Sequence, residues 1–190
     1  RPSVLYKMNR VTPGMVYSED VVNNTYQRFA NMRLYNSVSV ELNKVDTNIV
    51  DCFIRLIPSK THGYQVNLEA STNASGLIGI SPEISYYNRN IFKGGEWLSL
   101  SVMGNFQVSV KNETRAIEFG ANAGLSFPTF LLLPSSVFRN IVPRTDINLT
   151  YNYQQRPEYS RNMIGGKFGW SWGSKNNKWY FQATPLQINI

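Results

Sequence analysis

Seven short segments of alternating apolar and polar residues fill the chain after Gly63. In the first of them, residues 64–71, every second position is apolar and the positions between are polar. Successive side chains of a strand leave opposite faces, so this period predicts strands with one apolar and one polar face. The other six strands are expected at residues 78–86, 98–106, 117–126, 146–153, 167–172 and 179–190.

The apolar face of such a sheet suits one of two environments. In a soluble sandwich it packs into a core, whereas in a membrane barrel it meets lipid and the polar face lines a wet lumen. Strands of about ten residues, with tyrosine and tryptophan near their ends, favour a bilayer of roughly 25 Å apolar height. Closed bacterial barrels have an even number of strands, about eight or more, because an open edge in lipid leaves backbone groups unpaired. Seven strands do not close, so we expect the first part of a longer barrel, with an open soluble sheet as the alternative.

Residues 1–62 follow a different pattern. Pro13-Gly14 predicts a turn, and Ser18 is suited to cap a helix over residues 18–31. Apolar residues recur there at helical spacing, at Val22, Tyr26 and Phe29. Two strands are expected next, an alternating one at residues 38–42 and one at residues 49–58 that is apolar on both faces. The second is expected to be the more buried of the two.

The order turn, helix, exposed strand and buried strand resembles the end of a POTRA domain, a small periplasmic module of a strand, two helices and two strands. The resemblance implies a partial α+β POTRA module over residues 1–62, whose first strand would precede Arg1. An antiparallel transmembrane β-barrel, N-terminal part only, would then occupy residues 63–190. Another kind of small α+β module is the alternative for the first part.

Composition and charge argue against several classes of protein. The 190 residues carry a net charge of +7, divided into +3 (8 basic against 5 acidic) before residue 63 and +4 (11 against 7) after it. Neither part is a basic arm, so no nucleic-acid partner is expected. No apolar run approaches the roughly 18 residues of a membrane helix. The single cysteine, Cys52, excludes an intrachain disulfide framework and is expected to be a small buried hydrophobe.

A possible hydrolase motif occurs at Gly169-Trp170-Ser171-Trp172-Gly173, which fits the pattern GxSxG. That chemistry needs a strand-to-helix elbow and a histidine partner for the serine. Here the motif lies on a predicted strand, and the only histidine, His62, falls at the junction of the two parts. We therefore expect Ser171 to be a small lumen residue between two outward tryptophans. With one histidine and one cysteine, a metal site is not expected either, so we expect no cofactor and no enzymatic activity.

Several stretches of the chain resemble one family. They are residues 127–132, 142–145 (Val-Pro-Arg-Thr) and 151–162 (Tyr-Asn-Tyr-Gln-Gln-Arg-Pro-Glu-Tyr-Ser-Arg-Asn), together with 88–96 and 185–190. These residues look like the barrel of the Omp85 superfamily, in the BamA/TamA-like surface antigen form of Bacteroidota. Earlier POTRA repeats and later barrel strands of that family are not among these residues.

The resemblance implies an outer membrane factor of a Gram-negative bacterium that inserts or exports β-rich clients, with its POTRA side in the periplasm. Its partners would be outer membrane lipid and lipopolysaccharide, unfolded β-barrel clients and possible periplasmic or outer membrane accessory proteins. Clients would add a strand at an unpaired sheet edge. The expected lateral gate consists of Gly63, Tyr64, Val66, Asn67, Leu68 and Glu69. The expected POTRA edge strand consists of Ser37, Val38, Ser39, Val40 and Glu41.

Two other functions stay open at this point. The chain can belong to a passive channel or surface barrel, in which the N-terminal part is only a plug or a periplasmic foot. It can also carry a separate hydrolase domain on the barrel. The identity of the clients, the number of POTRA repeats and the total number of strands do not follow from these residues.

Overall fold

The computed structural model describes residues 2–72, 77–109, 115–133, 141–173 and 179–190. The helices are α1 (Pro2–Met8) and α2 (Glu19–Asn31). The strands are β1 (Tyr35–Lys44), β2 (Val50–Pro58), β3 (His62–Thr72), β4 (Leu77–Asn88), β5 (Trp97–Ser109), β6 (Arg115–Phe127), β7 (Val142–Gln155), β8 (Ser160–Gly173) and β9 (Tyr180–Asn189).

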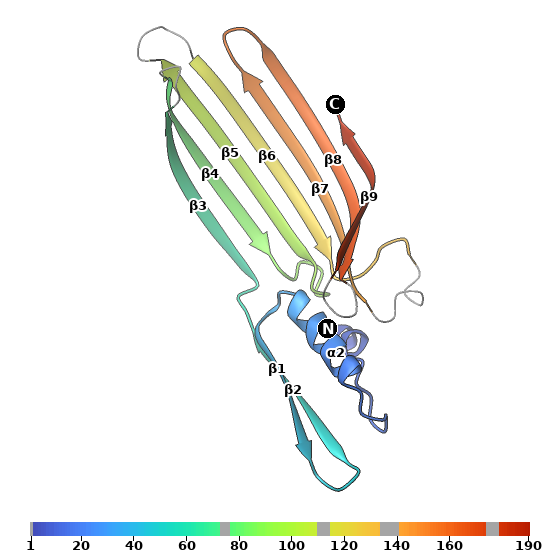
Figure 1. Cartoon of the computed structure of the whole chain (residues 1–190). Coiled ribbons are helices and arrows are strands. Elements are labelled where there is room, and N and C mark those ends of the chain that lie inside the picture. Colours follow the sequence, from blue (N-terminus) through green and yellow to red (C-terminus); the bar gives the residue numbers. More distant parts are fainter. Residues whose placement is uncertain (1, 73–76, 110–114, 134–140, 174–178) are drawn as a thin grey trace.

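Strands β3 to β9 form one antiparallel sheet in which each strand pairs with the next along the chain. All seven strands expected after Gly63 are present, most of them a few residues longer than the alternation alone indicates. Figure 1 shows them as one curved sheet, with the β1–β2 hairpin and α2 beyond one end. Over the described strands the sheet is not closed, and β3 and β9 are its two edges.

The register of the sheet sorts the side chains by polarity. Apolar residues pair with apolar residues across every strand boundary, as in Val66↔Ile84, Ile80↔Phe106, Phe106↔Ile117, Ala121↔Tyr151, Ile147↔Phe168 and Phe168↔Leu186. Most of these side chains are exposed, because no other element packs over this face among the described residues. The opposite face carries mainly small, amide and charged side chains. The alternation therefore gives a sheet whose apolar face has no protein cover in the described part of the chain.

Helices α1 and α2 and the β1–β2 hairpin form the N-terminal module. Its core is centred on Met8, Phe29 and Met32, with Val4, Leu34, Tyr35, Val38, Ile54 and Leu56 packed against it. The predicted helix is confirmed, with Ser18 in extended conformation at the N-cap position, although its side chain makes no capping hydrogen bond. Helix α1 was not expected from the sequence. None of the described helices has the length and apolar character needed to cross a membrane.

Two expectations for the hairpin are wrong. Strand β2 is not more buried than β1, since neither strand contains a buried residue, and Phe53 and Ile57 are largely exposed. Cys52 is only partly buried, opposite Leu42. The physical reason is the same for both. The helices cover one face of the hairpin near its base, so apolar residues on its other face and toward its tip have nothing to pack against.

Candidate functional site

The residues expected to form a lateral gate all lie on β3, an edge strand of the sheet. Tyr64, Val66 and Leu68 project from the apolar face and are 76%, 72% and 74% exposed. Within the described residues β3 pairs with β4 alone. An edge strand of this kind presents a row of unpaired backbone N–H and C=O groups. Strand β3 therefore has unpaired backbone groups along its outer edge and exposed apolar side chains on one face.

Gly63 lies at the start of this edge, paired with Tyr87 on β4. A Cβ atom built on Gly63 would lie 2.7 Å from the hydroxyl oxygen of Tyr87. Its φ angle is not in the left-handed region, so a side chain here would be limited by the space beside the Tyr87 ring rather than by backbone conformation. A hinge at Gly63 stays a prediction.

The polar side of the edge is held by side-chain hydrogen bonds. Asn67 Nδ2 donates to Glu83 Oε2 at 3.3 Å, and Gln65 Nε2 donates to Asn67 Oδ1 at 3.1 Å. Ser85 Oγ donates to the second oxygen of Glu83 at 3.2 Å. Glu69 lines the same groove as Asn67 and Glu83. These contacts fix the polar face of β3 onto β4 and leave the outer backbone edge accessible.

The expected POTRA edge residues, Ser37 to Glu41, lie on β1 and pair with β2. Val38 is opposite Leu56 and packs against the core of the module, and Val40 is opposite Ile54. The structure does not bring this strand and β3 into one sheet. In Figure 1 the hairpin points away from the seven-stranded sheet, so the two expected edges are separate sites.

A group of arginines where the N-terminal module meets the sheet was not expected from the sequence. Arg28 on α2 is 6% exposed, and its Nη2 donates to the carbonyl of Ile141 at 2.9 Å. In the other direction, Arg144 Nη2 on β7 donates to the carbonyl of Asn31 at 3.4 Å. Burial, and after it the positive charge of Arg10, lower the pKa of Arg28 to about 10. It remains a cation at neutral pH, so this junction holds two positive charges.

Two more arginines lie on the ring of Trp97, the first residue of β5. The guanidinium of Arg33 is 4.4 Å from the ring centroid, and that of Arg89 is 5.5 Å from it. Arg89 also lies 5.0 Å from the ring of Tyr87, and its Nη1 donates to Ser59 Oγ at 3.2 Å. Cations are attracted to the faces of aromatic rings, Trp most of all. The stack therefore connects the end of α2, the β2–β3 linker and the base of the sheet.

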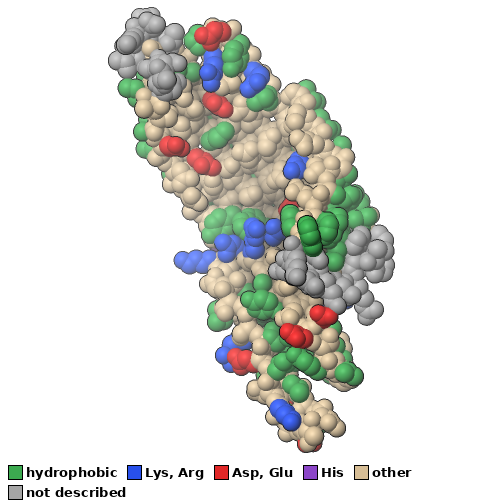
Figure 2. Space-filling view, in the orientation of Figure 1, with side chains coloured by type: hydrophobic (Ala, Val, Ile, Leu, Met, Phe, Trp, Pro, Cys, Tyr) green, Lys and Arg blue, Asp and Glu red, His purple; other side chains and the backbone are tan. Residues whose placement is uncertain are grey.

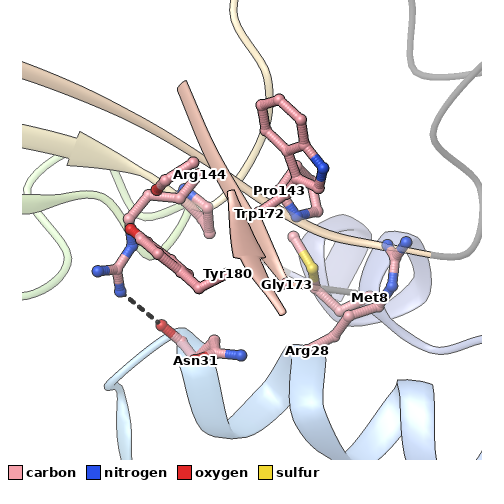
Figure 3. A pocket seen from close by; sticks show the side chains of 10 residues that line it. Met8, Arg28, Asn31, Pro143, Arg144, Trp172, Gly173 and Tyr180 are labelled. Atoms are coloured by element: carbon pink, nitrogen blue, oxygen red, sulfur yellow. Dashed lines mark hydrogen bonds between the residues drawn. The ribbon is translucent and has the colours of Figure 1, made fainter. Parts of the chain in front are cut away.

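A small cavity of about 140 Å³ lies at the same junction. Figure 3 shows that Arg28 and Asn31 approach it from α2, and Arg144 and Tyr180 from strands β7 and β9. Met8, Pro143 and Trp172 add apolar lining. The cavity thus has cationic and hydroxyl donors along an apolar wall. No sequence motif marks it, because its lining residues come from elements far apart along the chain.

Ser171 of the GxSxG pattern lies within β8, not on an elbow, and is 2% exposed. Its Oγ donates to Asp146 Oδ2 at 3.5 Å. His62 lies on β3, the edge strand farthest from β9 in the sheet. The histidine partner that the motif requires is therefore not beside Ser171. Among the described residues no group of three His, Cys, Asp or Glu side chains is placed to hold a metal ion.

Comparisons with known proteins give the following findings. No family model matches the chain, and no curated protein matches it. One similar solved structure is BamA from Haemophilus ducreyi lacking POTRA domains 1–3, with 15% identity over 92% of this chain and a TM-score of 0.37. Another is CdiB from Acinetobacter baumannii, with 13% identity over 90% of this chain and a TM-score of 0.47. The chain spans 42% and 40% of the length of these two structures.

Proposed function

We propose that the chain is part of an Omp85-type barrel in the outer membrane of a Gram-negative bacterium and takes part in inserting or exporting β-rich client proteins. The observation that carries this proposal is the strand β3, an exposed edge of a sheet with one apolar and one polar face. Client strands are added at that edge. The protein acts by binding and positioning its clients, without a cofactor and without catalysing covalent chemistry.

The membrane location is supported by the composition of the two sheet faces. A continuous apolar face over seven strands exceeds what a soluble protein exposes to water, whereas lipid is a suitable solvent for it. Figure 2 shows acidic and basic side chains at the far end of the sheet, further acidic ones along it, and Lys and Arg gathered where it meets the N-terminal module. In the proposed orientation the apolar face contacts outer membrane lipid and lipopolysaccharide, and the polar face lines the lumen.

Strand addition follows from the chemistry of the edge. A client strand beside β3 would gain backbone hydrogen bonds, each worth about 0.5 to 1.5 kcal/mol net. A client with period-two alternation would place its apolar side chains in line with Tyr64, Val66 and Leu68. Both faces of the sheet would then continue into the client without a change of polarity. The N-terminal module serves in this proposal as a periplasmic POTRA domain that meets clients and accessory proteins.

The proposal is tested by locking the edge in the intact protein. Cys52 is first changed to serine, and Asn67 or Glu69 and a facing residue on the last barrel strand are replaced by cysteine. If clients enter here, oxidation abolishes client insertion and reductant restores it, while the barrel stays folded. The matched control pairs Glu69→Cys with Ser81→Cys, which are opposite one another on β3 and β4. Because these strands are already paired, this crosslink leaves insertion unchanged.

Full client insertion by the oxidised protein, with the crosslink to the last strand demonstrated, would contradict the gate. The function of a passive channel or surface barrel would then explain the same sheet better. That alternative predicts ion conductance through the protein that the edge crosslink does not change.

A further inference from the structure

The arginines at the base of the sheet carry a second inference. Arg33, Arg89 and Arg144 form no ion pair among the described residues. Arg89 Nε is buried and has no hydrogen-bond partner in this part of the chain. Three cations therefore lie close together, and one N–H donor is left over. We propose that they form a binding site for a peptide segment that carries carboxylates.

Arg144 and Arg89 lie near enough for their charges to act on Arg33. Burial lowers the pKa of Arg33, the charges of Arg144 and then Arg89 contribute in the same direction, and Asp146 opposes them. Among the charged groups that act on Arg33, two are the cations Arg144 and Arg89 and one is the carboxylate of Asp146, which also accepts a hydrogen bond from Ser171. A bound anion relieves this mutual repulsion. Arginine also presents its donors in a planar fork that fits a carboxylate.

Existing contacts hold the guanidinium groups in place before any ligand arrives. Arg33 and Arg89 lie on the Trp97 ring, and Arg144 donates to the carbonyl of Asn31. Ordered side chains lose less conformational entropy on binding than free ones. The arrangement is therefore suited to binding an anion and is more than a chance excess of charge.

The register of the sheet identifies the face on which the site lies. Trp97 pairs with Ser126 and Arg144 pairs with Ser171, which places both on the polar face. A headgroup of lipid that covers the apolar face does not reach these residues. Farther along the same polar face lie the carboxylates of Glu69, Glu83 and Glu118. They repel an anion there, so the favourable position is confined to the base of the sheet.

A peptide is favoured over a small free anion because of what lies beside the site. Arg89 contacts Tyr87, and Tyr87 packs against Gly63 at the start of the β3 edge. An extended segment that reaches this edge would pass the arginines with its flanking residues. This choice of ligand rests on the proposed function, whereas the presence of an anion site does not.

The test uses the intact protein in detergent micelles and a fluorescein-labelled peptide of alternating aspartate and valine, followed by fluorescence anisotropy. We expect Arg33→Gln, Arg89→Gln and Arg144→Gln each to weaken binding about twofold to fivefold, and the triple variant by about tenfold or more. Arg33→Lys keeps the charge but loses the planar fork, so its affinity should lie between those of Arg33→Gln and the wild type. Binding should weaken as salt is raised, because these charges are partly exposed.

Arg161→Gln is the matched control, since it removes the same charge from the opposite end of the sheet. It should leave the affinity unchanged. The heat-modifiable folded fraction of each variant shows whether the protein is intact.

The site would be overturned if the triple variant bound the peptide as tightly as the wild type. It would also be overturned if a peptide with asparagine in place of aspartate bound equally well. Displacement of the peptide by phosphatidylglycerol added to the micelles, in an arginine-dependent manner, would assign the site to anionic lipid and overturn the peptide. If the wild-type protein binds the peptide but does not insert clients, that result would count against the proposed function alone.

Discussion

The guanidinium of Arg33 lies 4.4 Å from the centroid of the Trp97 ring. Arg33 follows the C-cap of α2 and has a φ angle of 54°, a left-handed conformation that costs a residue with a side chain some free energy. Trp97 begins strand β5. The contact therefore joins the last turn of the helix to the base of the sheet and orients the N-terminal module.

We expect this contact to protect the β2–β3 linker. Arg33→Gln and Trp97→Leu should each speed trypsin cleavage after the exposed Lys60, because the module then moves more freely against the sheet. A double-mutant cycle should give a coupling energy of about 0.5 to 1 kcal/mol, typical of a cation near an aromatic ring at a partly exposed site. Strictly additive effects of the two substitutions would show that the ring contact does not stabilise the junction.

Charges placed on the two faces of the sheet should have unequal effects. Phe119→Arg and Leu149→Arg put a cation on the apolar face, at a cost of roughly 2 to 4 kcal/mol near the midplane of a bilayer. The matched changes Asn122→Arg and Asn148→Arg fall on the polar face of the same two strands. The heat-modifiable folded fraction in membranes should fall for the first pair and change little for the second. Equal losses on both faces would contradict the orientation proposed for the sheet.

Gly79 and Gly166 provide a test of packing within the sheet. A Cβ atom on Gly79 would lie 2.9 Å from the carbonyl oxygen of Phe106, which belongs to the backbone and cannot easily move aside. Gly79→Ala should therefore destabilise the sheet by about 1 to 3 kcal/mol in urea unfolding. A Cβ on Gly166 would meet only a side-chain carbon of Leu149 at 3.7 Å, an ordinary contact. Gly166→Ala should unfold at nearly the wild-type urea concentration.

Cys52 should react more slowly in the folded protein than in the unfolded chain. Burial raises the pKa of its thiol, which reduces the fraction of reactive thiolate at a given pH. The pH profile of iodoacetamide alkylation should therefore have a higher midpoint in the native protein than in urea. Identical midpoints in the two states would show that the partial burial of Cys52 does not affect its ionisation.

The sequence by itself determined the strands of the sheet and the faces of their side chains. Alternation is a local property, because each side chain leaves the strand opposite to its neighbour whatever the strand pairs with. The same holds for α2, whose apolar spacing follows from the helical repeat. The residues expected at the gate are on an edge strand for a related reason, since β3 is the first strand of a meander and pairs only with β4 in the described part of the chain.

Only the tertiary structure decided how the module and the sheet meet. Arg28 contacts Ile141 and Arg144 contacts Asn31, in each case across 113 positions of the chain, and no local pattern encodes such a pairing. The exposure of β2 was missed for the same reason, because an apolar strand becomes buried only where another element covers it. Alternation sets the direction of a side chain within its own strand, whereas burial and contact depend on packing between distant segments. The cluster of arginines at the base of the sheet arises from that packing.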